Sequence, residues 1–220
     1  MENKTLKYKE IDISNKKPYV SINNYQCFYR DLPEDFNDGV AGFIINPDNQ
    51  ELRIQIIVDD EWVHDLHYEN MCFQFSQDDY IRDCHIIMTL KYFHKLREND
   101  YMQAGIWHEI GHFHTMHYFR YVTDGNSQNT YRMDLIEKGI VPDYEQAADL
   151  FAAYYTTPET VLTFLTRAIR ERLKLINDDN RFDAANEMRA RKAIIKEISS
   201  EEDIRERLCS LCKVDNFEII

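Results

Sequence analysis

Hydrophobic and polar residues alternate in the N-terminal part of the chain and follow helical spacing in the C-terminal part. In the run from Leu52 to Val58, apolar residues alternate with the polar Arg53 and Gln55. This period of two predicts a half-buried β-strand. A second β-rich run, Val40 to Ile45, precedes it, and turn-forming residues at 46–50 separate the two, so a β-hairpin is expected.

Spacings of three and four residues dominate after this hairpin. Residues 81–97 carry apolar side chains at that spacing, which predicts a helix. A second helix is expected from about Tyr101 to Phe119, and a third from Tyr144 to Tyr155, with Asp143 as its cap. Pro158 suits a first helical turn, and the chain after it reads as helical, including one helix from about Phe182 to Ile198 and a last one from Glu201 to Cys212.

These elements predict an α+β fold, with a small antiparallel or mixed sheet in the N-terminal half and a helical C-terminal half. A chain of 220 residues is within the size range of one domain, and no repeat or low-complexity linker divides it. We therefore expect a single domain over residues 1–220. It would comprise a mixed α/β part at 1–100, a central pair of helices at 101–157 and accessory helices at 158–220.

The composition favours an intracellular protein that does not bind nucleic acid or membranes. A formal charge of −13 would repel nucleic-acid backbones and anionic membranes. The chain has no apolar run long enough to span a bilayer, and its first residues lack the apolar core of a secretory signal. Its five cysteines are an odd number and are scattered, which suits a reducing compartment. The cytoplasm is the expected location.

One short motif indicates metal chemistry. His108, Glu109 and His112 satisfy the pattern H-E-x-x-H, in which the two histidines lie one helical turn apart on the same face. Two imidazoles so placed can bind one Zn²⁺, and the glutamate beside them can take a proton from the metal-bound water. The motif predicts a zinc site with Glu109 as the catalytic base.

Catalytic zinc sites need a third protein ligand, and one known arrangement is absent here. That arrangement has a glycine three residues after the second histidine and a further histidine three residues later, where this chain has Thr115 and Tyr118. His114 and His117 do not replace the missing ligand, because on a continuous helix they point away from His112. We interpret both as surface or packing residues.

A glutamate from a second helix is the other source of a third ligand. Glu145 and Asp149 share one helix face, so Glu145 can bind the metal while Asp149 accepts the outer N–H of His108. Gly111 in the first helix and Ala148 in the second are small enough for the two helices to approach closely. The alternative is a solvated acidic pair, which is common in a chain with 39 acidic residues.

These two segments resemble the gluzincin metallopeptidases, most closely those of the ImmA/IrrE type. The second motif of that family, E-x-x-A-[ND]-x-F-A followed by a proline, matches here at Glu145, Ala148, Asp149, Phe151, Ala152 and Pro158. The resemblance covers about residues 100–158. It implies a zincin-like fold with one Zn²⁺ per chain, bound by His108, His112 and Glu145, and with Glu109 as the base.

The expected function is therefore hydrolysis of peptide bonds in an intracellular protein or peptide substrate, such as a regulator. A catalytically silent regulatory protein that kept the zinc scaffold is the first alternative, and a helical interaction protein with an accidental motif is the second. The presence of Glu109 favours the enzyme, because a structural zinc site needs no base and usually has four protein ligands. The sequence leaves the oligomeric state open.

Two further features of an active site have candidates in the sequence. A donor for the oxyanion is sought among Tyr131, Tyr154 and Tyr155, each of which is also a plausible packing residue. The strand Leu52 to Val58 is a hypothesis for an edge strand that aligns an extended substrate, and an ordinary inner strand is the alternative.

Overall fold

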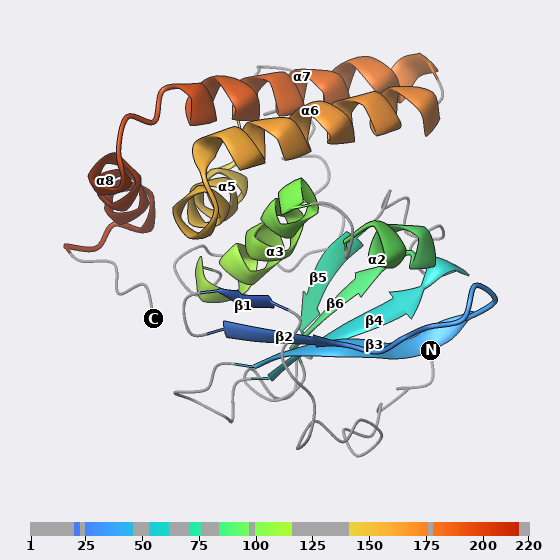
Figure 1. Ribbon diagram of the computed structural model, residues 1–220. Helices are drawn as coiled ribbons and strands as arrows, with labels where there is room; N and C mark the ends of the chain where they lie inside the picture. Colours follow the sequence, from blue (N-terminus) through green and yellow to red (C-terminus); the bar gives the residue numbers. More distant parts are fainter. Residues whose placement is uncertain are drawn as a thin grey trace. The chain divides into compact units, whose positions relative to one another are not determined.

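The computed structural model describes residues 20–22, 25–45, 53–61, 71–75, 84–96, 100–115, 141–175 and 178–215. The chain divides into two compact units, Met1–Glu98 and Asn99–Ile220. The first contains a sheet and helix α2 (Leu90–Leu96), and the second contains helices and no strand among its described residues (Figure 1). The predicted class is confirmed at this level: an α+β chain with a mixed sheet in its N-terminal half and helices in its C-terminal half.

The first unit is built on a six-stranded sheet with the order β1-β2-β3-β4-β6-β5. Its strands are β1 (Val20–Ile22), β2 (Tyr25–Tyr29), β3 (Asp38–Ile45), β4 (Arg53–Asp59), β5 (Met71–Phe75) and β6 (Cys84–Met88). The strands β3 and β4 pair antiparallel, as the predicted hairpin requires, while residues 46–50 between them lie outside the described part. The pairing of β4 with β6 is parallel.

The position of β4 contradicts the edge-strand hypothesis. This strand lies inside the sheet, with β3 on one side and β6 on the other. Its backbone groups are engaged with both neighbours, and even the polar side chain of Gln55 is buried. A strand with two partners cannot accept an extended peptide along its edge.

The helix predicted at residues 81–97 is confirmed over Leu90–Leu96 and is wrong over Cys84–Met88. The chain forms strand β6 there first and turns into helix α2 (Leu90–Leu96) only afterwards. Three consecutive apolar residues of this strand, 86–88, are buried, as is typical of a strand covered on both faces. The helix begins at Leu90 because Thr89 caps it: the Thr89 hydroxyl accepts the backbone N–H of Tyr92 at 3.2 Å. The Asp60 side chain also accepts the backbone N–H of Leu90 at 2.6 Å.

The second unit is a bundle of helices. They are η2 (Asp100–Met102), α3 (Gln103–Thr115), α5 (Asp143–Tyr155), α6 (Pro158–Leu175), α7 (Asp178–Lys196) and α8 (Glu201–Cys212). Helix α5 contacts α3, α6, α7 and α8, while α6 and α7 lie side by side (Figure 1). None of the helices in the described residues is long and apolar enough to cross a membrane.

Most helix boundaries in this unit follow the predictions. Helix α6 begins at Pro158 and α8 at Glu201, as expected. Helix α7 begins at Asp178, ahead of the predicted Phe182. The predicted continuation of α3 beyond Thr115, up to residue 119, lies outside the described residues.

The start of α5 differs from the prediction in its cap. Asp143 is the first residue of the helix, and the preceding cap residue, Pro142, has no side-chain hydrogen bond. The Pro142 carbonyl instead accepts the backbone N–H groups of Glu145 and Gln146, each at 3.0 Å. Capping by the Asp143 side chain is therefore wrong, and the backbone itself holds Glu145 in the first helical turn.

Candidate metal centre

Helix α3 places the two histidines of the H-E-x-x-H motif next to each other. The Nε2 atoms of His108 and His112 lie 3.1 Å apart, and the two rings meet edge to face. The opposite side of the helix is anchored by Ile106 and Ile110, which are both fully buried. The periodicity that predicted this helix therefore also orients both imidazoles to one side.

A close helix–helix contact places α5 directly against these histidines. A Cβ added at Gly111 would lie 2.9 Å from the Cα of Ala148 and 2.9 Å from the Cβ of Phe151. Real Cβ atoms are not found that close to such atoms, so a side chain at this position would force the helices apart. The small residues predicted to allow close approach are indeed at the contact.

This contact brings Glu145 to the histidine pair. Its Oε2 lies 3.4 Å from Nε2 of His108 and 3.9 Å from Nε2 of His112. The three side chains form a buried or partly buried group whose potential ligand atoms all lie within 4.8 Å of one another. They are close enough to bind a single metal ion.

Asp149 supports the other side of His108. Its Oδ1 lies 2.8 Å from Nδ1 of His108, and its side chain is 3% exposed. A carboxylate at this distance accepts the N–H on Nδ1 and leaves Nε2 facing the ligand group. The structure thus brings together all four side chains that the sequence analysis assigned to the metal and its support.

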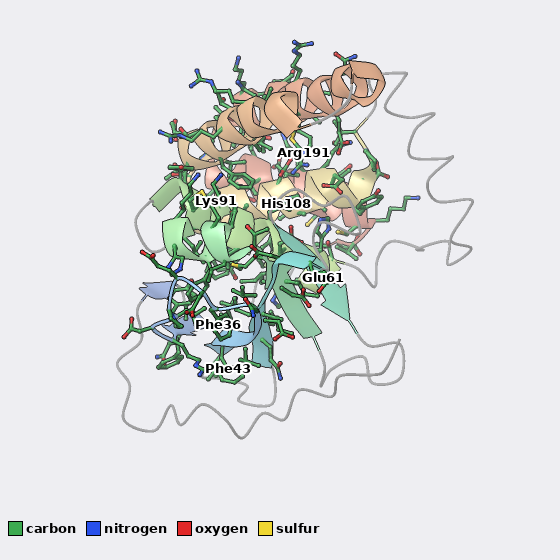
Figure 2. All side chains as sticks on the ribbon, turned by 90° about the vertical axis from the view of Figure 1, so that its right-hand side faces the viewer. Phe36, Phe43, Glu61, Lys91, His108 and Arg191 are labelled. Atoms are coloured by element: carbon green, nitrogen blue, oxygen red, sulfur yellow. The ribbon has the colours of Figure 1, made fainter. Side chains whose placement is uncertain are left out.

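An arginine from helix α7 completes the cluster, and the sequence analysis did not find it. The Nε and Nη2 atoms of Arg191 each lie 2.6 Å from a different oxygen of Asp149. Nη1 lies 3.2 Å from Oε2 of Glu145 and 3.8 Å from Oε1 of Glu187, one turn back on α7. Figure 2 labels Arg191 and His108. The Nη2 atom of Arg191 lies 3.3 Å from Nδ1 of His108.

The buried charges of the described residues are concentrated in this one place. The residues concerned are Glu109, Glu145, Asp149, Glu187 and Arg191, and the buried His108 lies among them. Burying a charge is costly unless it is paired or binds a metal. Three of these carboxylates, those of Glu145, Asp149 and Glu187, lie within 3.8 Å of the Arg191 guanidinium. Even with His108 protonated, the positive charges are outnumbered, which favours a bound cation.

The two histidines have opposite proton affinities. Burial and the Arg191 charge lower the pKa of His108, but the carboxylates of Asp149 and Glu145 outweigh them and raise it to about 9. Burial, together with the neighbouring His108, lowers the pKa of His112 to about 3. His112 is therefore a neutral imidazole with a free lone pair at neutral pH, whereas His108 carries a proton unless a cation replaces it.

The carboxylates remain ionised despite their burial. Burial raises the pKa of Glu145, but Arg191 and the two imidazoles outweigh this effect and hold it well below its usual range. The pKa of Asp149 is lowered in the same way, with Arg191 making the largest opposing contribution. Both groups therefore present negative charge to the site at neutral pH.

Glu109 lies on α3 beside His108 and is 9% exposed. His114 stacks on Phe151 with ring centroids 5.1 Å apart, as expected of a packing residue. The other histidine considered, His117, lies outside the described residues.

The tyrosine candidates for an oxyanion donor are engaged elsewhere where they are described. Tyr155 stacks on Trp107 with centroids 4.2 Å apart, and the Tyr154 hydroxyl accepts a hydrogen bond from Arg205. Tyr131 lies outside the described residues. The ring of Tyr144, which the sequence analysis did not consider, lies 6.0 Å from that of His112.

No protein-family model matches this chain, and neither a curated protein nor a solved structure matches it. The resemblance to gluzincins is therefore carried by the two sequence motifs alone.

The helix contact at Gly111 gives a first prediction. Gly111→Ala should lower the free energy of unfolding by about 1–3 kcal/mol, because the new methyl group overlaps the α5 backbone. In an exposed helix the same change would stabilise the protein by about 1 kcal/mol. The measurement is denaturant unfolding, with Ser210→Ala on the exposed face of α8 as control. A stabilised Gly111→Ala variant would contradict the close contact.

Proton release on metal binding gives a second prediction. At pH 7 His108 is protonated, because its pKa is about 9, while His112, with a pKa of about 3, is not. Binding a divalent ion should therefore release close to one proton, and affinity should fall by about tenfold for each pH unit below 9. Calorimetric titration in two buffers of different ionisation enthalpy measures the number of protons released for each ion bound. Binding heats that do not depend on the buffer would count against the assigned ligands.

Proposed function

We propose that this protein is a zinc-dependent metallopeptidase that hydrolyses peptide bonds in a protein or peptide substrate. The observation that carries the proposal is the convergence of His108, His112 and Glu145 from two helices, with Asp149 behind His108. We further propose that the chain has the zincin-like fold of the ImmA/IrrE-type gluzincins, because its two sequence motifs resemble the motifs of that family.

The donor set and its spacing favour zinc. Two imidazoles and one carboxylate suit zinc, whereas magnesium and calcium prefer oxygen ligands. Ligands placed tetrahedrally at roughly 2.0–2.1 Å from an ion lie about 3.3–3.4 Å from one another. The observed separations of 3.1, 3.4 and 3.9 Å bracket that value, so a small tetrahedral ion fits with minor adjustment.

A catalytic role is favoured over a structural one. Structural zinc sites usually have four protein ligands, while catalytic sites have three and keep one position open. Within the described residues, the group around the histidines comprises three side chains. His112 is the most exposed of them, at 15% of its side chain, so water and substrate would approach from its side.

In the proposed mechanism, Glu109 takes a proton from the attacking water and delivers it to the leaving amine. Zinc held by the three side chains would supply a Lewis acid for the peptide carbonyl and lower the pKa of the water towards neutrality. Asp149 holds the His108 imidazole so that its Nε2 faces the ligand group. Each of these roles falls on a residue of α3 or α5.

Glu109→Gln should separate metal binding from hydrolysis. The variant should keep its zinc and lose about 10²–10⁴-fold in cleavage rate, because the amide cannot accept the proton. Cleavage is measured by mass spectrometry on a diverse pool of synthetic peptides, with Glu206→Gln on the exposed face of α8 as control. If wild type and Glu109→Gln behave alike in every assay while both hold zinc, the silent regulatory alternative is correct.

Two histidine variants of the same helix test the metal site itself. His112→Ala should abolish stoichiometric zinc in the purified protein, because two ligands cannot hold the ion tightly. His114→Ala should retain it, because this ring packs on Phe151. Metal analysis of both proteins after dialysis gives the answer. Equal zinc content in the two variants would show that the motif does not bind the metal.

A further inference from the structure

Arg191 makes more contacts with the candidate metal centre than packing of α7 alone would require. Its side chain is 5% exposed, and its guanidinium reaches Glu145, Asp149 and Glu187 at distances of 2.6–3.8 Å. Nη2 also lies 3.5 Å from Nε2 of His108, the atom that faces the other ligands. One side chain therefore contacts both the ligand carboxylate and the carboxylate that orients a ligand histidine.

The geometry of these contacts requires the fork of an arginine. Nε and Nη2 pair with the two oxygens of Asp149, each at 2.6 Å, which leaves Nη1 directed at Oε2 of Glu145. Two parallel N–H···O bonds fix the plane of a carboxylate as well as its position. A lysine carries the same charge on a single nitrogen and cannot make the pair and the third contact together.

Two effects on a bound cation oppose each other. The positive guanidinium repels a divalent ion at the nearby ligand atoms, and this lowers affinity. Fixing Glu145 and Asp149 in the arrangement that the ion needs raises affinity, because the ligands are not reorganised on binding. The three buried carboxylates that contact Arg191 leave a net negative charge after pairing with it, so the repulsion is offset locally.

We infer that Arg191 is a positioning residue of the metal centre, which holds Glu145 and Asp149 in the geometry that binds the ion. Helix α7 is then part of the metal site, although Arg191 lies 83 residues after His108 and α7 lies outside both motifs. The inference rests on the metal site of the proposed function and adds a fifth side chain to it.

The test measures metal affinity without using catalytic activity. Zn²⁺ is titrated into the metal-free full-length chain in competition with a chromophoric chelator, and Co²⁺ absorption reports the ligand geometry. Arg191→Lys and Arg191→Met should each weaken Zn²⁺ binding by about 10–100-fold, the effect usual for residues that support a ligand. Both should also alter the Co²⁺ spectrum, which a loss of helix packing alone would not do.

Arg205→Met is the matched control, because Arg205 also joins two helices but contacts Tyr154. It should keep the wild-type affinity and spectrum. Should Arg191→Met fail to fold, Arg191→Lys and Glu187→Gln carry the test; the latter removes the carboxylate that lies 3.8 Å from Nη1 and should weaken binding less.

The outcomes separate this inference from the function on which it rests. Unchanged or tighter binding by both Arg191 variants, with a wild-type chain that binds Zn²⁺, would overturn the inference and leave the proposed function intact. A wild-type chain that binds neither Zn²⁺ nor Co²⁺ would overturn both.

Discussion

The contact between α3 and α5 at Gly111 is the constraint on which the site depends. At this point the two helices approach so closely that one added methyl group would overlap the Ala148 backbone. Glu145 lies one turn before Ala148, and its Oε2 reaches within 3.4 Å of His108 only because the helix axes are this close. A larger residue on either side would separate a carboxylate from two imidazoles that must share one ion.

The cluster formed in this way is costly for the protein. A helix that buries Glu145 and Asp149 removes two carboxylates from water, and their pairing with Arg191 recovers only part of the lost hydration. Hydrophobic residues of similar volume often stabilise a core as well or better. The concentration of all buried charges of the described residues around His108 and His112 is therefore best explained by a function.

The parts of the site that follow from local periodicity could be predicted from the sequence. His108 and His112 share a helix face because they are four residues apart, and the same spacing applies to Glu145 and Asp149. Small residues such as Gly111 indicated where the two helices could meet. In each case a pattern within one helix was sufficient, and the structure brings the resulting faces together.

Features that depend on distant pairing could not be predicted in this way. Arg191 belongs to an ordinary charged helix, and nothing within α7 indicates that its partner is Asp149, which lies 42 residues earlier. The interior position of β4 follows from its parallel pairing with β6, a strand formed much later in the chain. The apolar residues of β6 itself fit a helical spacing as well as a buried strand, since a short apolar run suits either.

The most direct test of this account is X-ray absorption at the zinc edge on the purified, metal-loaded protein, together with its zinc content. We expect one zinc per chain in a shell of nitrogen and oxygen ligands at roughly 2.0–2.1 Å, with the scattering pattern of two imidazoles. A shell that contains sulfur, as binding by Cys209 and Cys212 would give, or the absence of stoichiometric zinc, would contradict it.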